Sequence, residues 1–445
     1  MKYLLRRWLF LILFLTFRIQ AQEPPNFTHY FLANGLEVVI IPNNRAPVVF
    51  HSLWYKVGSA DSPENRSGLA HFLEHLLFNG TEKYPADSFK RIINDLGGSQ
   101  NANTTWDRTV YFVTIAKEHL PLVMQLEADR MQNVLITETA VAKEKAVVLQ
   151  ERRSTVDARP EACLFEATNK AFFWVHPYGK PVIGYEEDIR QYSKEDALNF
   201  YQRWYAPNNA ILIVAGDVSV EKLKPLIQET YGNLKTSILP KRQYAIEPNH
   251  RGATAKVEMR DPQIGYPFFQ RIYSAPNFRT QGIHQEAVLT LLHDILGDST
   301  FGRLNQSLVE KQKIAHFATA GYVGYFYDPY SFTLSAAPIN TNDLLLLEAS
   351  IESEVRRLIS EGVSDAELTT AKEQWGYEYD YRSDSINGIA NLFGESLSVG
   401  YQMKDIETWL STLRSISADE VKLTAKEILG VGPSVTAYAF PVVQK

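Results

Sequence analysis

The stretch "SKEDALNFYQRWYAPNNAILIVAGD" (193–217) constrains the fold most, because its outline returns as "SADEVKLTAKEILGVGPSVTAYAFP" (417–441). The opening strands of the chain also resemble "KVEMRDPQIGYPFFQRIYSAPN" (256–277). Strands and helices alternate in both halves. This pattern predicts an α+β fold with two homologous domains, each a mainly antiparallel β-sheet with helices packed on one face.

A change of composition separates the two halves. Residues 235–254, "KTSILPKRQYAIEPNHRGAT", contain two prolines and show no clear hydrophobic period. This pattern is typical of a linker. We therefore expect an N-terminal domain at 22–234 and a C-terminal domain at 255–445.

Local patterns predict the elements of the first half. "LEVVII" and "VVFHSLWYKV" read as a pair of strands beside a turn at Asn34-Gly35, and "RTVYFVTIA" (108–116) as another strand. A helical region begins near Ser67, with that serine as its cap. "ETAVAKEKAVVLQERRSTVDARP" predicts a helix that stops near Pro160.

Residues 1–21 have the pattern of a secretory signal peptide. Lys2 and two arginines precede a short apolar core, and Ala21 supplies the small residue before the cleavage point. The alternative is an uncleaved anchor. A cleaved signal predicts export to the periplasm or the extracellular space, with no stable membrane span in the mature chain.

Charge and cysteine content restrict the functions that remain. The chain has 45 basic and 51 acidic residues, and four of the basic ones lie in 1–21. Such an acidic mature chain argues against nucleic acid as a partner. The single Cys163 excludes an intramolecular disulfide and a cysteine-based zinc site.

Three ionisable residues interrupt the apolar segment "SGLAHFLEHLLFNGTEKYP" (67–85). On a helix, His71, Glu74 and His75 share one face. Two imidazoles four residues apart can bind one Zn²⁺, and the glutamate then lies beside the metal, where it can take a proton from water. The alternative is a helix with two hydrogen-bonded histidines and a glutamate by chance.

A catalytic zinc site needs a third protein ligand, and the predicted helix before Pro160 offers one. Glu151 lies near its end, and Glu144, seven residues earlier, occupies almost the same face. Glu151 can bind the metal while Glu144 supports a ligand imidazole. The alternative is a solvated charged helix.

These residues resemble the pitrilysin/insulinase family of zinc peptidases, whose motif H-x-x-E-H is inverted. The resemblance rests on "GLAHFLEHLLFNGTEKYP" with Glu151 at 76 positions beyond His75. It extends over "GGSQNANTTWDRTVYF" (97–112), "HPYGKPVIG" (176–184) and "YAPNNAILIVAGDVS" (205–219). Size and two-half layout resemble the mitochondrial-processing-peptidase-like branch and its bacterial relatives.

The resemblance implies a role for each matching residue. It implies one zinc ion per chain bound by His71, His75 and Glu151, and catalytic roles for Glu74, as general base, and Glu144, as supporting carboxylate. It further implies that Asn101 and Ala102 bind substrate on an exposed strand edge, where a peptide adds as a β-strand. In the alternative, Asn101 caps the turn after two glycines.

The second half departs from the family pattern. Members supply an Arg and a Tyr seven residues apart, but Val309 and His316 stand at these positions. Arg303 and Tyr322 lie nearby with the wrong spacing, and His293 is interpreted as a core residue. The departure implies a paralogous subunit that supplies Arg and Tyr, with a homodimer as the alternative.

We therefore expect an exported zinc metalloendopeptidase that hydrolyses peptides or unfolded polypeptide segments, as one half of a two-subunit chamber. Two alternatives stay open. One is a non-catalytic structural or assembly subunit of the same family. The other is a zinc-dependent peptide-binding subunit that does not cleave by itself.

Overall fold

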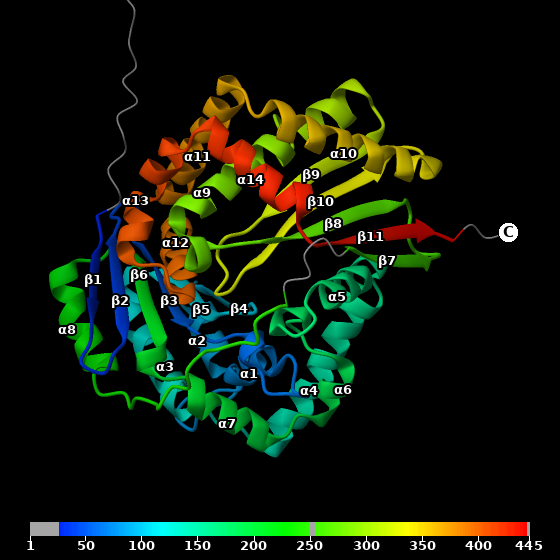
Figure 1. Cartoon of the computed structure of the whole chain (residues 1–445). Coiled ribbons are helices and arrows are strands. Elements are labelled where there is room, and N and C mark those ends of the chain that lie inside the picture. The colour runs from blue at the N-terminus through cyan, green and yellow to red at the C-terminus, as the bar shows by residue number, and fades with distance from the viewer. Residues whose placement is uncertain (1–25, 249–253, 443–445) are drawn as a thin grey trace, which may run out of the picture.

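The computed structural model describes residues 26–248 and 254–442. The predicted signal peptide and the end of the predicted linker, 249–253, lie outside the described residues. Two β-sheets, one from each half of the chain, form the frame of the molecule (Figure 1). No helix within the described ranges is long and apolar enough to cross a membrane.

The first sheet has six strands in the order β1-β2-β6-β3-β5-β4. Only β2 and β6 run parallel, whereas the other neighbouring strands are antiparallel. The turn at Asn34-Gly35 contains the positive φ of +83° at Gly35, but it joins β1 to β2. The predicted pair, β2 and β3, is separated by β6. The strands are β1 (Thr28–Phe31), β2 (Glu37–Pro42), β3 (Val48–Tyr55), β4 (Ser99–Thr104), β5 (Thr109–Ala116) and β6 (Ala210–Gly216).

The second sheet repeats this topology without a counterpart of β1. Its order is β7-β11-β8-β10-β9, and only β7 and β11, the counterparts of β2 and β6, run parallel. The similarity of the two halves, predicted from weak sequence patterns, is therefore confirmed at the level of strand order. The strands are β7 (Thr254–Asp261), β8 (Phe268–Ala275), β9 (Ala315–Tyr322), β10 (Tyr330–Pro338) and β11 (Ser434–Pro441).

Helices of the first half cover one face of the first sheet and bury the largest apolar cluster. The predicted helix before Pro160 consists of α4 and one π-helical turn at 153–157, and Pro160 begins the next helix. The helices are α1 (Leu69–Leu77), α2 (Ser88–Asp95), α3 (Leu120–Asn133), α4 (Glu138–Arg152), α5 (Pro160–Phe172), α6 (Glu186–Gln191), α7 (Lys194–Trp204) and α8 (Val220–Tyr231).

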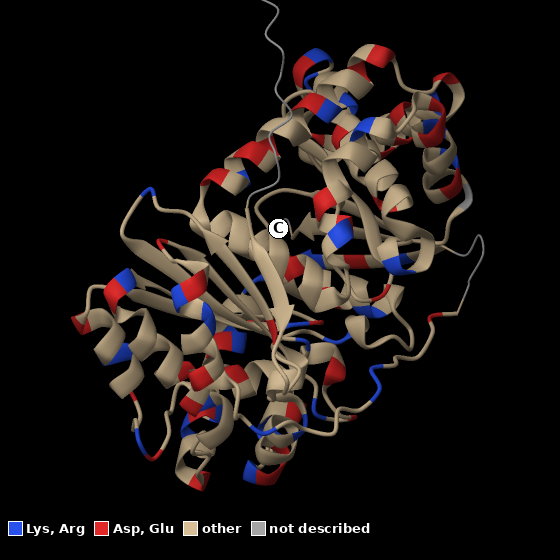
Figure 2. Cartoon of the chain, turned by 90° about the vertical axis from the view of Figure 1, so that its left-hand side faces the viewer, with Lys and Arg blue, Asp and Glu red and all other residues tan. Residues whose placement is uncertain are grey.

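Helices of the second half likewise pack on one face of the second sheet, chiefly α9, α10 and α14. In the view of Figure 2, charged residues of both signs are interspersed over the outer helices of both halves. The helices are α9 (Phe278–Gly297), α10 (Leu344–Glu361), α11 (Asp365–Asp384), α12 (Ile386–Val399), α13 (Met403–Ser415) and α14 (Ala418–Val431).

One helix of each half packs on the sheet of the other half, which the sequence did not predict. Helix α12 packs on β3 and β6, where Phe393 joins a core cluster with Trp54 and Ile213. Helix α5 packs on β7 and β11, where Leu164 meets Ala437. The α+β class is confirmed, and this exchange covers the faces that the repeat alone would leave open.

The linker adds a polar connection between the halves. Residues 235–248 contain no helix or strand. Arg242 donates hydrogen bonds to Asp61 at 2.7 and 3.0 Å and to the carbonyl of Asp107 at 2.7 Å. The Asp107 carboxylate accepts the backbone N–H of Tyr327, from the second half, at 2.9 Å.

Candidate metal centre

The position of α1 depends on the two residues before it. Gly68 has φ +82°, and a Cβ there would lie 2.4 Å from the carbonyl oxygen of Ile183, so only glycine fits. Ser67 was predicted to cap the helix, but this is wrong, because Gly68 occupies the N-cap position. The Ser67 side chain instead donates to Asp188 and accepts the N–H of Tyr185 at 3.0 Å.

Helix α1 separates its apolar and ionisable residues by face. Its leucines, with Ala70 and Phe72, lie in the first core. His71, Glu74 and His75 face α4 and the edge of the sheet, as the spacing predicted, and His71 and His75 have ring centroids 4.8 Å apart. The helix therefore fixes three functional groups on a rigid, buried support.

Helix α4 brings two carboxylates to these imidazoles. Glu151 Oε1 lies 3.8 Å from His71 Nε2, and Glu151 Oε2 lies 3.3 Å from His75 Nε2. Glu144 Oε2 lies 3.6 Å from the other ring nitrogen of His75, Nδ1. Glu144 is nearly buried, whereas the Glu151 side chain is 36% exposed.

The geometry of this set fits a zinc ion. One ligand atom from each of His71, His75 and Glu151 lies within 4.8 Å of the others, and no second such cluster occurs within the described ranges. Two ligands of a tetrahedral zinc, each about 2.0–2.1 Å from the metal, are about 3.4 Å apart. The 3.3 Å between Glu151 and His75 matches this value, and the 3.8 Å between Glu151 and His71 is slightly longer. Glu144 is placed to orient the His75 ring.

The electrostatics of the two histidines differ. Burial and the neighbouring charge of His75 lower the pKa of His71 to about 4. Burial also acts on His75, but hydrogen bonds with Glu144 and Glu151 raise the pKa of His75 to about 9. Hydrogen bonding to His75 lowers the pKa values of Glu144 and Glu151. Both carboxylates are thus held ionised, the form that supports a cation.

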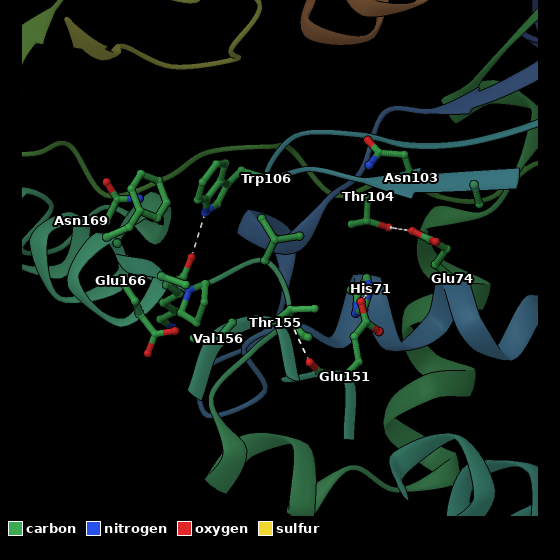
Figure 3. A pocket seen from close by; sticks show the side chains of 18 residues that line it. His71, Glu74, Asn103, Thr104, Trp106, Glu151, Thr155, Val156, Glu166 and Asn169 are labelled. Carbon is green, nitrogen blue, oxygen red and sulfur yellow. Dashed lines mark hydrogen bonds and ion pairs between the residues drawn. The ribbon is translucent and has the colours of Figure 1, made fainter. Parts of the chain in front are cut away.

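Glu74 lies beside the ligand cluster in a different environment. Burial raises its pKa, although a hydrogen bond from Thr104 Oγ1 to Glu74 Oε2, at 2.5 Å, opposes this shift. Figure 3 shows Thr104 reaching from β4 towards Glu74, while His71 and Glu151 lie next to each other. A carboxylate with a raised pKa next to a metal site suits proton transfer.

Strand β4 is one of the two edge strands of the first sheet, and among the described residues it pairs with β5 alone. Asn101 is exposed on this strand and caps no turn, because its side chain accepts the backbone N–H of Ala102 at 2.9 Å. That N–H therefore points away from β5, towards the open edge. The structure brings Asn101 and Ala102 to the sheet edge beside α1.

A cavity of about 490 Å³ connects the ligand cluster with β4 and α5. Its wall is mixed, with Trp106, Phe165 and Ile183 among the apolar side chains and Lys180 among the polar ones. Trp106 packs on Phe326 and Tyr330 of the second half. None of the 18 residues that line it in Figure 3 is Arg or Tyr.

The two residues that stand in place of the family's Arg and Tyr, Val309 and His316, do not line this cavity. Val309 packs against the second core, and His316 is exposed beside Tyr266. Arg303 pairs with Glu367.

The remaining candidates of the second half also have local partners. Tyr322 donates to the carbonyl of Pro276. His293 was interpreted as a core residue, but its side chain is 29% exposed and pairs with Asp294 at 2.8 Å. No metal-binding cluster within the described part of the chain includes it.

Thr104 is the residue of this site that sequence reasoning missed. Its contact with Glu74 joins positions 30 residues apart, so no local spacing reveals it. The alternation of β4 was the available signal, because Ala102 and Thr104 share the face of the strand that meets α1.

Family comparisons match both halves. The sequence model described as "Insulinase (Peptidase family M16)" matches residues 37–186, which include the ligand cluster. The model described as "Peptidase M16 inactive domain" matches residues 191–375.

Individual relatives agree with these matches. "Zinc protease PqqE" of Helicobacter pylori is 29% identical over 423 residues, which is 94% of this chain and 93% of that protein. The crystal structure of a protease from Helicobacter pylori has a TM-score of 0.85 at 26% identity, covering 94% of this chain and 100% of that one.

The periplasmic protease PqqL from Escherichia coli shares the fold, with a TM-score of 0.81 at 19% identity. This chain covers only 48% of that chain. The name of the Helicobacter pylori relative implies that zinc is the cofactor of the family. On both sequence models, the chain belongs to the insulinase family of peptidases, M16.

Proposed function

We propose that this chain is an exported zinc metalloendopeptidase that hydrolyses peptides or unfolded polypeptide segments. One observation carries the proposal: His71, His75 and Glu151 converge within 4.8 Å, beside Glu74 and an open sheet edge. A purely structural subunit has no need of a buried base next to three convergent ligand atoms.

The residues of the chain have distinct tasks in this reaction. When bound, zinc supplies a Lewis acid that makes water more acidic and polarises the scissile carbonyl. Glu74 accepts the proton of the attacking water and then delivers it to the departing amine. Glu144 holds the His75 ring through Nδ1 and leaves Nε2 for the metal.

Substrate binding follows from the edge strand. An extended peptide that pairs with β4 would replace the Asn101 side chain as partner of the Ala102 N–H. Pairing of this kind reads the backbone more than the side chains and tolerates varied sequences. It requires a substrate segment without stable structure of its own.

Stabilisation of the oxyanion requires a hydrogen-bond donor. Among the described residues that line the cavity there is no Arg or Tyr. We propose that a paralogous second subunit supplies both. In the alternative, a homodimer, a second copy of this chain closes the chamber. The twofold greater length of the PqqL chain supports a two-part assembly. Placement in the mitochondrial-processing-peptidase-like branch stays a prediction.

The same incomplete wall supports the second candidate function, a peptide-binding or assembly subunit that does not cleave. The match to the "inactive domain" model, residues 191–375, begins at the end of the first half and does not include the ligand cluster. The two functions differ in whether a peptide bound at the site is cleaved.

A quenched-fluorescence peptide library separates them. The zinc-loaded wild type should cleave unstructured peptides, and Glu74→Gln should abolish cleavage while retaining zinc. If cleavage appears only after the companion protein is added, the shared site is supported. Activity that Glu74→Gln leaves unchanged would refute the proposal, and no cleavage with either companion would favour the binding subunit.

Export rests on residues 1–21 alone. Sequencing the N-terminus of the protein recovered from its native cell should give Gln22 as the first residue. A mature protein that begins at Met1 would contradict a cleaved signal peptide.

A further inference from the structure

The hydroxyl of Thr104 holds the carboxylate of Glu74. Both side chains are nearly buried, Thr104 at 8% and Glu74 at 9% exposure. The hydrogen bond of 2.5 Å to Glu74 Oε2 is the one that the described residues give this carboxylate. Thr104 ends β4 and Glu74 lies on α1, so the bond joins the edge strand to the helix of the metal ligands.

The direction of this hydrogen bond is fixed by its neighbours. An ionised carboxylate only accepts, so the Thr104 hydroxyl must donate. Thr109 lies 3.4 Å from the Thr104 oxygen, but its own proton goes to the carbonyl of Val57 at 3.0 Å. Of the two acceptors near the Thr104 hydroxyl, Glu74 Oε2 at 2.5 Å is far closer than the Thr109 oxygen at 3.4 Å, so the Thr104 proton goes to Glu74 Oε2. This leaves Oε1 for the proton of an attacking water.

The backbone of Thr104 belongs to the substrate side of the strand. The N–H of Ala102 faces the open edge, because it meets the Asn101 side chain rather than β5. Outward-facing backbone groups alternate along an antiparallel edge strand, so those of Thr104 face the same edge. One residue thus presents its backbone to an incoming peptide and its side chain to the base.

We propose that Thr104 is a positioning residue that sets the carboxylate of Glu74 relative to a peptide paired with β4. This inference rests on the proposed peptidase function and deepens it. Thr104 does not touch the reacting atoms. Thr104 couples the register of the bound peptide strand to the position of the Glu74 carboxylate, which deprotonates the water.

The kinetic test compares Thr104→Val, Thr104→Ser and Thr168→Val in the zinc-loaded protein, with the companion subunit if cleavage requires it. Valine keeps the shape and removes the hydroxyl, and serine keeps the hydroxyl. Thr168 is the matched control, since its buried hydroxyl donates to the carbonyl of Leu164, away from Glu74.

Misplacing the base should act on the chemical step. We expect Thr104→Val to lower kcat about 10- to 100-fold with KM nearly unchanged. Thr104→Ser should restore kcat to near the wild-type value, and Thr168→Val should leave it unchanged. A Thr104→Val protein with wild-type kcat, or a loss of kcat that serine does not restore, would overturn the proposal.

A second readout does not depend on activity. Crystal structures of the metal-free variants should show the Glu74 carboxylate displaced in Thr104→Val and in place in Thr104→Ser. A carboxylate unmoved in Thr104→Val overturns the positioning role, whatever the kinetics. If the wild type cleaves nothing but the displacement is seen, the peptidase function fails while the positioning of Glu74 by Thr104 stands.

Discussion

The ionisable residues of α1 differ by the partners that the fold gives them. His71 faces Glu151, His75 lies between Glu144 and Glu151, and Glu74 turns to Thr104. In the proposed peptidase, contacts between α1 and α4 therefore place two side chains for metal binding. The contact between α1 and β4 places the third for proton transfer.

A buried carboxylate in the second half makes stability depend on pH. Glu286 is 2% exposed and accepts the hydroxyl of Tyr401 and the N–H of Phe278. Burial raises its pKa from 4.5 to about 7, with Asp405 adding to this effect. The folded state binds this proton more tightly than the unfolded chain does. Its stabilising contribution is complete below pH 4.5 and is lost as the pH rises to about 7.

Glu286→Gln should remove this dependence. Between pH 5 and pH 8, the free energy of unfolding of the wild type should fall by roughly 2 to 3 kcal/mol more than that of the variant. Urea unfolding at the two pH values measures the difference. Glu361→Gln, at an exposed position, is the control and should follow the wild type. Equal falls for wild type and Glu286→Gln would contradict the assignment.

At the residue scale, sequence reasoning found the groups whose chemistry follows local spacing. His71 and His75 are four residues apart on one helix, and Glu151 was predicted because a zinc site demands a third ligand; the structure brings the three together. Thr104 could not be found in the same way, because only the packing of β4 on α1 brings it to Glu74. The capping role of Ser67 failed for a related reason, since the distant Asp188 binds its side chain.

Among the elements, α12 approaches the first sheet unusually closely. Gly394 lies against the ring of Trp54, and a Cβ there would be 2.0 Å from Trp54 Cε2. The helix can cover β3 and β6 at this distance only because the residue is glycine.

Gly394→Ala should therefore lower the free energy of unfolding by about 1–3 kcal/mol, because the added methyl overpacks the interface. Gly376→Ala, on the neighbouring α11, is the matched control, since its nearest contact is 3.8 Å away. That change should stabilise by up to about 1 kcal/mol through helix propensity. Urea denaturation of both variants checks the prediction, and a shift of the same sign in both would contradict it.

At the element scale, most strands and helices of the first half were predictable from hydrophobic pattern. The pairing of the strands was less predictable, because β6, which lies between β2 and β3 in the sheet, begins 155 positions after the end of β3. The sequence also did not predict that α5 packs on the second sheet and α12 on the first. An apolar helix face indicates burial, but it does not say which sheet covers it.

At the scale of the whole molecule, the linker connects the two halves through the buried guanidinium of Arg242. The side chains of Arg242, Asp61 and Asp107 are 9%, 2% and 1% exposed. Burial acts to lower the pKa of Arg242, but the charge of Asp61 and its other partners outweighs burial and raises the pKa, so Arg242 stays protonated. The halves are thus joined at a polar cluster as well as by the exchanged helices.

Arg242→Met should lower the free energy of unfolding by about 3–5 kcal/mol at neutral pH, because two buried carboxylates lose their partner. Limited proteolysis should then cut the linker at 235–248 faster than in the wild type. The exposed Lys241→Met serves as the control. A linker equally resistant in Arg242→Met and wild type would show that this cluster does not fasten it.

The measurement that tests the central claim most directly is the zinc content of the purified chain, by elemental analysis. The wild type should bind about one zinc ion per chain. Glu151→Gln should lose nearly all of it, and Glu144→Gln should bind about 10- to 100-fold more weakly. Glu138→Gln, exposed on the same helix, should bind as the wild type does. A wild type without zinc, or a Glu151→Gln protein that retains it fully, would contradict the metal centre.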